Sequence, residues 1–76
     1  MNLAYVLINT NMGSEAKVTK DLNKIEEVKE VYGVYGVYDI VVRVEAETME
    51  KLKAAISDSI RTLENVRSTL TMIVVD

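Results

Sequence analysis

Apolar positions along the chain predict four strands. The stretch LAYVLINT (residues 3–10) is apolar nearly throughout and rich in Val, Ile and Leu, which is typical of a strand covered on both faces. Beta-branched residues also dominate residues 28–35 and DIVVRVEA (39–46), and RSTLTMIVV (67–75) has the same character.

A different period, typical of a helix, separates the first two predicted strands. Val18, Leu22 and Ile25 fall at i, i+4 and i+7, so one side of this segment is apolar. Gly13 is expected in the turn before it, and Ser14 is expected to be its N-cap.

A second amphipathic helix is predicted after the third strand. Thr48 is its expected N-cap, and apolar residues follow at spacings of three and four: Met49, Leu52, Ile56, Ile60 and Leu63. The order of elements is therefore β-α-β-β-α-β.

This order within 76 residues is typical of the ferredoxin-like α+β fold, a four-stranded antiparallel sheet with two helices. The right-handed crossover rule places both helices on one face. In a monomer the other face should be polar at alternate positions, yet residues 3–8 are apolar without interruption, and residues 40–44 are interrupted only by Arg43. Because so large an apolar patch is rare on soluble monomers, we expect two copies to pack sheet to sheet as a dimeric α+β barrel.

Composition agrees with association and limits the classes of function. A domain of 76 residues is marginally stable alone, and the chain has no Cys or His for disulfide or zinc support. The net charge is −3 and the Lys and Arg residues are scattered, so no face for direct nucleic-acid binding is predicted. The chain has no signal-peptide pattern and no transmembrane run, so we predict a cytoplasmic protein.

Catalysis and metal binding are not predicted. The chain has no Ser beside a candidate base and no pair of carboxylates at an obvious catalytic spacing. Glu26, Glu27 and Glu30 are interpreted as a solvated face, and no carboxylate-rich loop is present. No cofactor is expected.

Three segments resemble a known family: AYVLINTNMGSEAKV (4–18), VKEVYGVYGVYDIVVRVEAET (28–48) and VRSTLTMIVV (66–75). Together they resemble the C-terminal effector-binding domain of the Lrp/AsnC, or feast/famine, transcription regulators, from Leu3 to Val75. The most specific part is the Gly-x-x-Asp of GVYD (36–39). Those regulators carry an N-terminal helix-turn-helix, and this chain starts at the first strand, so the resemblance implies a stand-alone effector domain.

The resemblance also implies an amino-acid site, because the Gly-x-x-Asp loop of the family lines a small-molecule site where dimers meet. Asp39 is then expected to accept a hydrogen bond from the ligand's ammonium, and amides near Gly36 are expected to donate to its carboxylate. Hydroxyls of the last strand, from the same or a neighbouring subunit, and two tyrosines are the other expected members: Ser68, Thr69, Thr71, Tyr35 and Tyr38.

The residues by themselves leave structural interpretations open at each of these positions. Gly36 can be a hairpin residue with positive φ, Asp39 can cap a turn, and Gly33 can mark a bulge or a close backbone approach. The threonines can reflect β-propensity, and the tyrosines can be packing residues.

The sequence therefore predicts an amino-acid-sensing module whose dimers assemble into an octamer or decamer, with full-length Lrp/AsnC regulators as expected partners. Two alternatives stay open. One is a purely structural oligomerisation module without a ligand. The other is an ACT-like regulatory domain, although its glycine signature after the first strand is not matched by NTNMGSE (residues 9–15).

Overall fold

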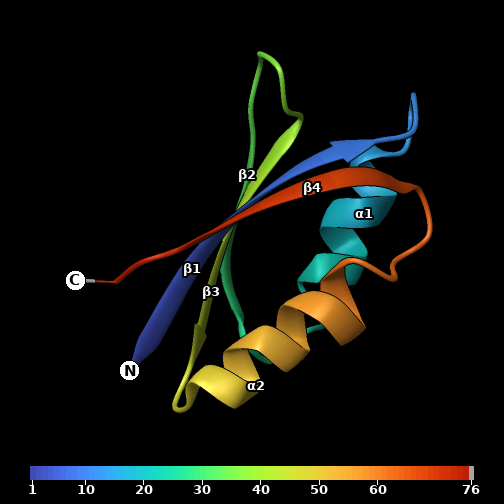
Figure 1. Cartoon of the computed structure of the whole chain (residues 1–76). Coiled ribbons are helices and arrows are strands. Elements are labelled where there is room, and N and C mark those ends of the chain that lie inside the picture. The colour runs from blue at the N-terminus through green and yellow to red at the C-terminus, as the bar shows by residue number, and fades with distance from the viewer. Residues whose placement is uncertain (76) are drawn as a thin grey trace.

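The elements follow the predicted order (Figure 1). The computed structural model describes residues 1–75, and their helices and strands are β1 (Asn2–Thr10), α1 (Glu15–Leu22), β2 (Val28–Gly33), β3 (Ile40–Ala46), α2 (Met49–Ala54), its π-helical continuation η1 (Ala55–Ile60) and β4 (Val66–Ile73). No helix in this range is long and apolar enough to cross a membrane.

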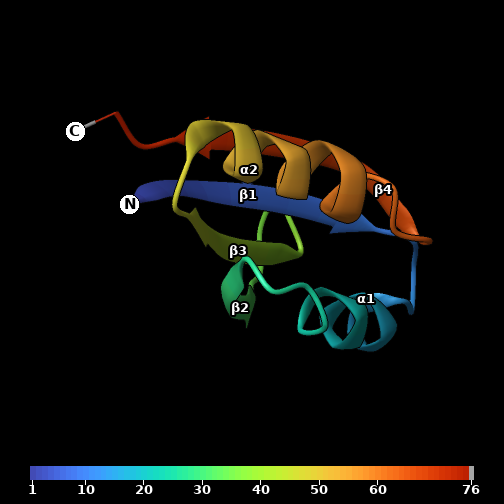
Figure 2. The ribbon, with the colours of Figure 1, turned by 90° about the horizontal axis from the view of Figure 1, so that it is seen from below.

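The strands form one antiparallel sheet of four in the order β2-β3-β1-β4. Val6 at the centre of β1 lies opposite Val42 on β3 and Thr71 on β4. Figure 2 shows α2 running beside β1, while α1 lies nearer β2. The predicted ferredoxin-like α+β fold is confirmed.

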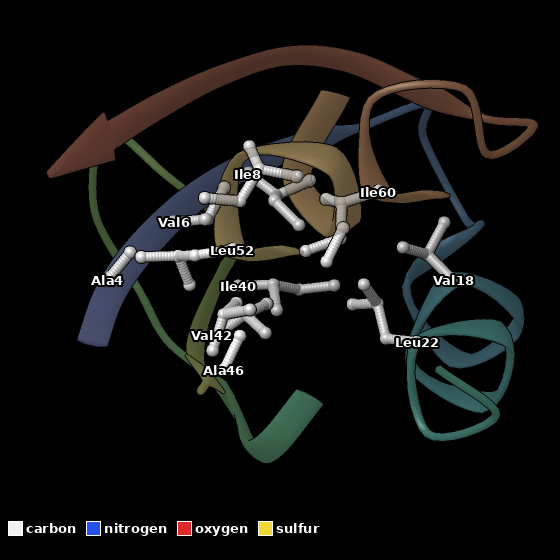
Figure 3. Packing of buried hydrophobic residues seen from close by; sticks show 13 residues of the cluster. Ala4, Val6, Ile8, Val18, Leu22, Ile40, Val42, Ala46, Leu52 and Ile60 are labelled. Atoms are coloured by element: carbon white, nitrogen blue, oxygen red, sulfur yellow. The ribbon is translucent and has the colours of Figure 1, made fainter. Parts of the chain in front are cut away.

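The core forms between one face of the sheet and the two helices. Every second residue of β1 from Ala4 to Thr10, and of β3 from Ile40 to Ala46, is buried. Side chains from the helices meet them, as Figure 3 shows for Val18, Leu22, Leu52 and Ile60. Each fully buried Val, Leu or Ile stabilises the fold by about 1.5–3 kcal/mol, so this layer is the main source of stability.

Both helices are shorter than the apolar spacing predicts. α1 ends at Leu22 because the N–H groups of Lys24 and Ile25 bond three residues back, so Ile25 packs on the core from outside the helix.

Thr48 caps α2 as predicted, its Oγ1 accepting from the N–H of Lys51 at 3.1 Å. Ser14 occupies the N-cap position of α1 but makes no side-chain capping bond.

The two strands of the central hairpin, β2 and β3, are also shorter than predicted. β2 ends at Gly33 instead of residue 35, and β3 begins after Asp39. The expectation of a bulge or close approach at Gly33 was wrong, because Gly33 pairs regularly with Ile40 and a Cβ there would meet no heavy atom within 4 Å. The register shift in this pair of strands lies between Val28 and Glu30 instead.

The open face of the sheet is apolar over β1 and β4, whereas over β2 and β3 it is mixed, with Tyr32 and Val41 beside charged residues. Leu7 pairs with Leu70 and Tyr5 with Met72, and the two β4 side chains are 45% and 47% exposed. On the other half, the Arg43 guanidinium lies 2.8 Å from Glu30 Oε1 and 2.7 Å from Glu45 Oε2. The prediction of two apolar faces therefore needs correction at Arg43, Glu30 and Glu45, whose ion pairs occupy part of the β2–β3 half.

Candidate ligand site

The loop between β2 and β3, residues 34–39, extends beyond the sheet (Figure 1). The N–H of Val34 donates to the carbonyl oxygen of Asp39 at 2.9 Å and closes the hairpin. Gly36 has a φ of 144°, so the predicted positive φ at this position is confirmed. Tyr35 and Val37 at the tip are almost fully exposed.

Asp39 attaches this loop to the end of β1. Its Oδ2 accepts from the Thr10 N–H at 2.9 Å and lies 3.4 Å from Thr10 Oγ1, and its own N–H donates to the carbonyl oxygen of Ile8 at 2.9 Å. Thr10 is only 4% exposed and lies beyond the end of β3, so its N–H would otherwise be buried without an acceptor. The Asp39 carboxylate thus takes the place of the carbonyl acceptor that a neighbouring strand would supply to the Thr10 N–H. Its other oxygen, Oδ1, makes no hydrogen bond within residues 1–75.

A cavity of about 360 Å³ lies between this loop and α1, and it is lined by Glu15, Thr19, Gly33, Val34, Tyr35, Gly36, Asp39 and Ile40. It contains three of the predicted site residues, Tyr35, Gly36 and Asp39. Sequence reasoning missed Glu15 and Thr19; their i, i+4 spacing puts them on one side of α1, but only the packing of α1 shows which side faces the loop.

The cavity is lined by two carboxylate residues, Glu15 and Asp39, and two hydroxyl residues, Thr19 and Tyr35, and no Lys or Arg lines it. Such a lining suits a ligand that carries a positive charge or a hydrogen-bond donor. A smaller hollow of about 230 Å³ beside Met1 and Ala46, at the opposite ends of β1 and β3, contains none of the predicted residues. Residues 1–75 hold no cluster of three or more potential metal ligands.

The hydroxyl residues of β4 do not join this cavity. Ser68 and Thr69 line a separate hollow of about 320 Å³ with Arg61, Val66 and Arg67, and Thr71 is exposed opposite Val6. Ser68 also lies on the open face, where its Oγ accepts from Asn9 Nδ2 at 3.3 Å, whereas Thr69 and Thr71 share the register of the helix-covered face.

The predicted site residues therefore fall into two groups on either side of β1. Gly36 and Asp39 line the cavity beside α1, whereas Ser68 and Thr69 line the hollow beside β4, and no residue lines both. Tyr38 is half-buried and lines neither hollow. Within a single chain the structure assembles only the loop half of the predicted site.

Comparison with known proteins places the chain among regulatory domains. The family model described as the Lrp/AsnC ligand binding domain matches residues 3–76. The crystal structure of FFRP-DM1 superposes with a TM-score of 0.94 at 40% identity, over 99% of this chain and 100% of that one. A hypothetical protein from Pyrococcus horikoshii, PHS023, superposes with a TM-score of 0.92 at 40% identity, over 99% and 90%.

A larger relative has been crystallised with a ligand. The feast or famine regulatory protein Rv3291c from M. tuberculosis, complexed with L-methionine, has a TM-score of 0.78 and 28% identity. All of this chain aligns with it, but the alignment spans only 51% of that protein. A comparison with curated protein sequences gave no match.

Proposed function

This chain belongs to the Lrp/AsnC ligand-binding domain family, and we propose that it is an amino-acid-sensing module. Domains of this family are regulatory and not enzymatic, and membership also removes the ACT-like alternative. The observation that carries the proposal is the cavity between the β2–β3 loop and α1, which Asp39 and Gly36 line together. The L-methionine complex of the M. tuberculosis relative supports the choice of ligand class.

The chemistry of this cavity fits the head group of an amino acid. Asp39 is held in place through Oδ2, so Oδ1 can accept from an ammonium without loss of the bond to Thr10. Gly36 has no side chain, and no heavy atom lies within 4 Å of its Cβ position, so a carboxylate can approach the loop amides. Hydrogen bonds with charged partners are about twice as strong as neutral ones, which makes these two contacts the main anchors.

We propose that the module works as an assembly. The apolar half of the open sheet face, formed by Leu3, Tyr5, Leu7, Leu70 and Met72, packs against the same face of a second copy. Such dimers associate further into an octamer or decamer. The partners of the assembly are full-length Lrp/AsnC regulators in the cytoplasm, and ligand binding changes how they act on DNA.

Calorimetric titration with the twenty amino acids, L-methionine first, tests the sensing function. Asp39→Asn keeps an oxygen for the Thr10 N–H but removes the negative charge, so it should retain most of the stability and bind about ten- to a hundredfold more weakly. Asp39→Ala should lose both binding and stability. No heat with any amino acid at millimolar concentration would refute the proposal.

A structural module without ligand is the second candidate, and one observation favours it. The Asp39 carboxylate already has a partner in Thr10, which explains its position without any ligand. Under this alternative the unmodified chain binds no amino acid. Titrations of the unmodified chain and of Asp39→Asn should then give the same result, with no heat of binding.

We also propose that this chain alone does not bind duplex DNA specifically. Its net charge is −3, and the ion pairs of residues 1–75 already involve Lys17, Lys24 and Arg43. A gel shift with genomic fragments should give no saturable, sequence-dependent complex at physiological salt. Such a complex, formed by the purified chain, would contradict the proposal.

A further inference from the structure

The cavity between the β2–β3 loop and α1 contains a carboxylate that the head group of an amino acid does not need. Asp39 is bound to Thr10 through Oδ2, and in the proposed function it accepts from the ligand's ammonium. Glu15, the other acid of the cavity, is exposed at the first residue of α1. It forms no ion pair within residues 1–75, so its negative charge is available to a ligand.

No positive side chain of the cavity competes for Glu15. The cavity has no Lys or Arg among its lining residues. On the same helix, the Lys17 and Lys24 ammonium groups lie 3.0 Å and 3.9 Å from the two carboxylate oxygens of Asp21. Thr19 lies one turn after Glu15 on the same side of α1 and lines the same cavity, so its hydroxyl is a further acceptor beside the carboxylate.

The charge of the cavity distinguishes between classes of amino-acid side chain. The head group of an amino acid carries one positive and one negative charge, so a ligand with a neutral side chain leaves Glu15 without a partner. Such a ligand displaces water from an unpaired carboxylate, which is costly. A side chain that ends in an ammonium or guanidinium group instead forms a charge-assisted hydrogen bond with Glu15, and an acidic side chain is repelled. At about 360 Å³, the cavity falls within the range of roughly 300–1,000 Å³ that is usual for small-molecule sites.

We propose that the cavity selects amino acids whose side chain ends in a cation, and that Glu15 determines this specificity. This inference rests on the proposed function and names the ligand class of the same site. Asp39 and the loop amides hold the head group, while Glu15 and Thr19 bind the positive end of the side chain.

Calorimetric titration with L-lysine and L-norleucine tests this specificity, because the two share one carbon chain and only L-lysine carries the terminal ammonium. The unmodified chain should bind L-lysine about tenfold or more tighter than L-norleucine. Glu15→Gln keeps the size of the side chain and removes its charge. It should weaken L-lysine binding by about tenfold and leave L-norleucine binding equal or stronger.

Glu50→Gln is the matched control. Glu50 is the acid in the first turn of α2, as Glu15 is in α1, so both act favourably on the dipole of their helix. Glu50 is exposed and does not line the cavity, so its loss should change neither affinity. Circular dichroism verifies the fold of both variants.

The unmodified chain alone already separates the possible outcomes. If it binds L-norleucine as tightly as L-lysine, this inference is overturned while the sensing function stands. The same holds if a folded Glu15→Gln variant keeps the ratio of the two affinities. An unmodified chain that binds none of the twenty amino acids overturns both.

Discussion

Val6→Asp and Leu7→Asp change neighbouring residues, but they should affect different properties of the protein, its fold and its association. Val6 is fully buried beneath the helices, whereas Leu7 points to the open face, where it pairs with Leu70. Val6→Asp should unfold the chain. Leu7→Asp should leave the fold intact and separate the copies.

The magnitudes follow from the burial of each side chain. A domain of this size has a free energy of unfolding of about 4–11 kcal/mol, from roughly 0.05–0.15 kcal/mol per residue. Val6→Asp loses the burial of Val6, about 1.5–3 kcal/mol, and places a carboxylate without a partner in an apolar layer at a cost of several kcal/mol more. The sum is close to the whole stability.

Leu7→Asp acts on the interface instead. A two-fold interface contains each residue twice, so the change puts two carboxylates between the sheets. At about 2–3 kcal/mol each, they should raise the dissociation constant of the dimer about a thousandfold or more.

Analytical ultracentrifugation across micromolar concentrations, together with far-UV circular dichroism, measures both outcomes. Met12→Asp adds the same charge on a loop residue that is 99% exposed, and it should change neither fold nor association. A folded Leu7→Asp variant with the dissociation constant of the unmodified chain would refute the sheet-to-sheet dimer. So would an unmodified chain that stays monomeric at these concentrations.

Three further changes test the local arguments by urea or thermal denaturation. Asp39→Ala should lower the free energy of unfolding by about 1–3 kcal/mol, because it leaves the buried Thr10 N–H without an acceptor. Asp39→Asn should lower it much less, and equal losses would contradict the role of Asp39 as that acceptor. Gly36→Ala should be destabilising by about 1 kcal/mol at a φ of 144°, whereas Gly33→Ala, where φ is not positive and space is open, should be neutral or stabilising. Thr48→Ala should cost about 1 kcal/mol through loss of the cap on α2, and no change would exclude that bond in solution.

The sequence by itself determined the order of the elements and the cap at Thr48, but not which face of each strand is buried. These features follow from periods of two and of 3.6 residues and from preferences that act over a few residues. The positive φ at Gly36 was predictable for the same reason, because a short hairpin needs such a residue between its strands.

The tertiary structure decided which of the candidate residues lie together. The carboxylate of Asp39 meets Thr10, 29 residues away, because β3 begins at Ile40 opposite Ile8, so β1 extends past β3 and its last N–H has no partner there. The Ser and Thr residues of β4 suggested a single cluster of three hydroxyl-bearing side chains. Strand alternation instead places Ser68 on one face of the sheet and Thr69 and Thr71 on the other.

Arg61 and Arg67 show the same limit most clearly. They lie six positions apart in the sequence, on either side of a turn, and nothing in their local sequence distinguishes them from other exposed cations. They share a hollow because Asn65 adopts positive φ against Asn11 and because β4 carries an extra residue opposite the end of β1. Turn conformation and strand register at that point depend on contacts between residues more than fifty positions apart, which no local period encodes.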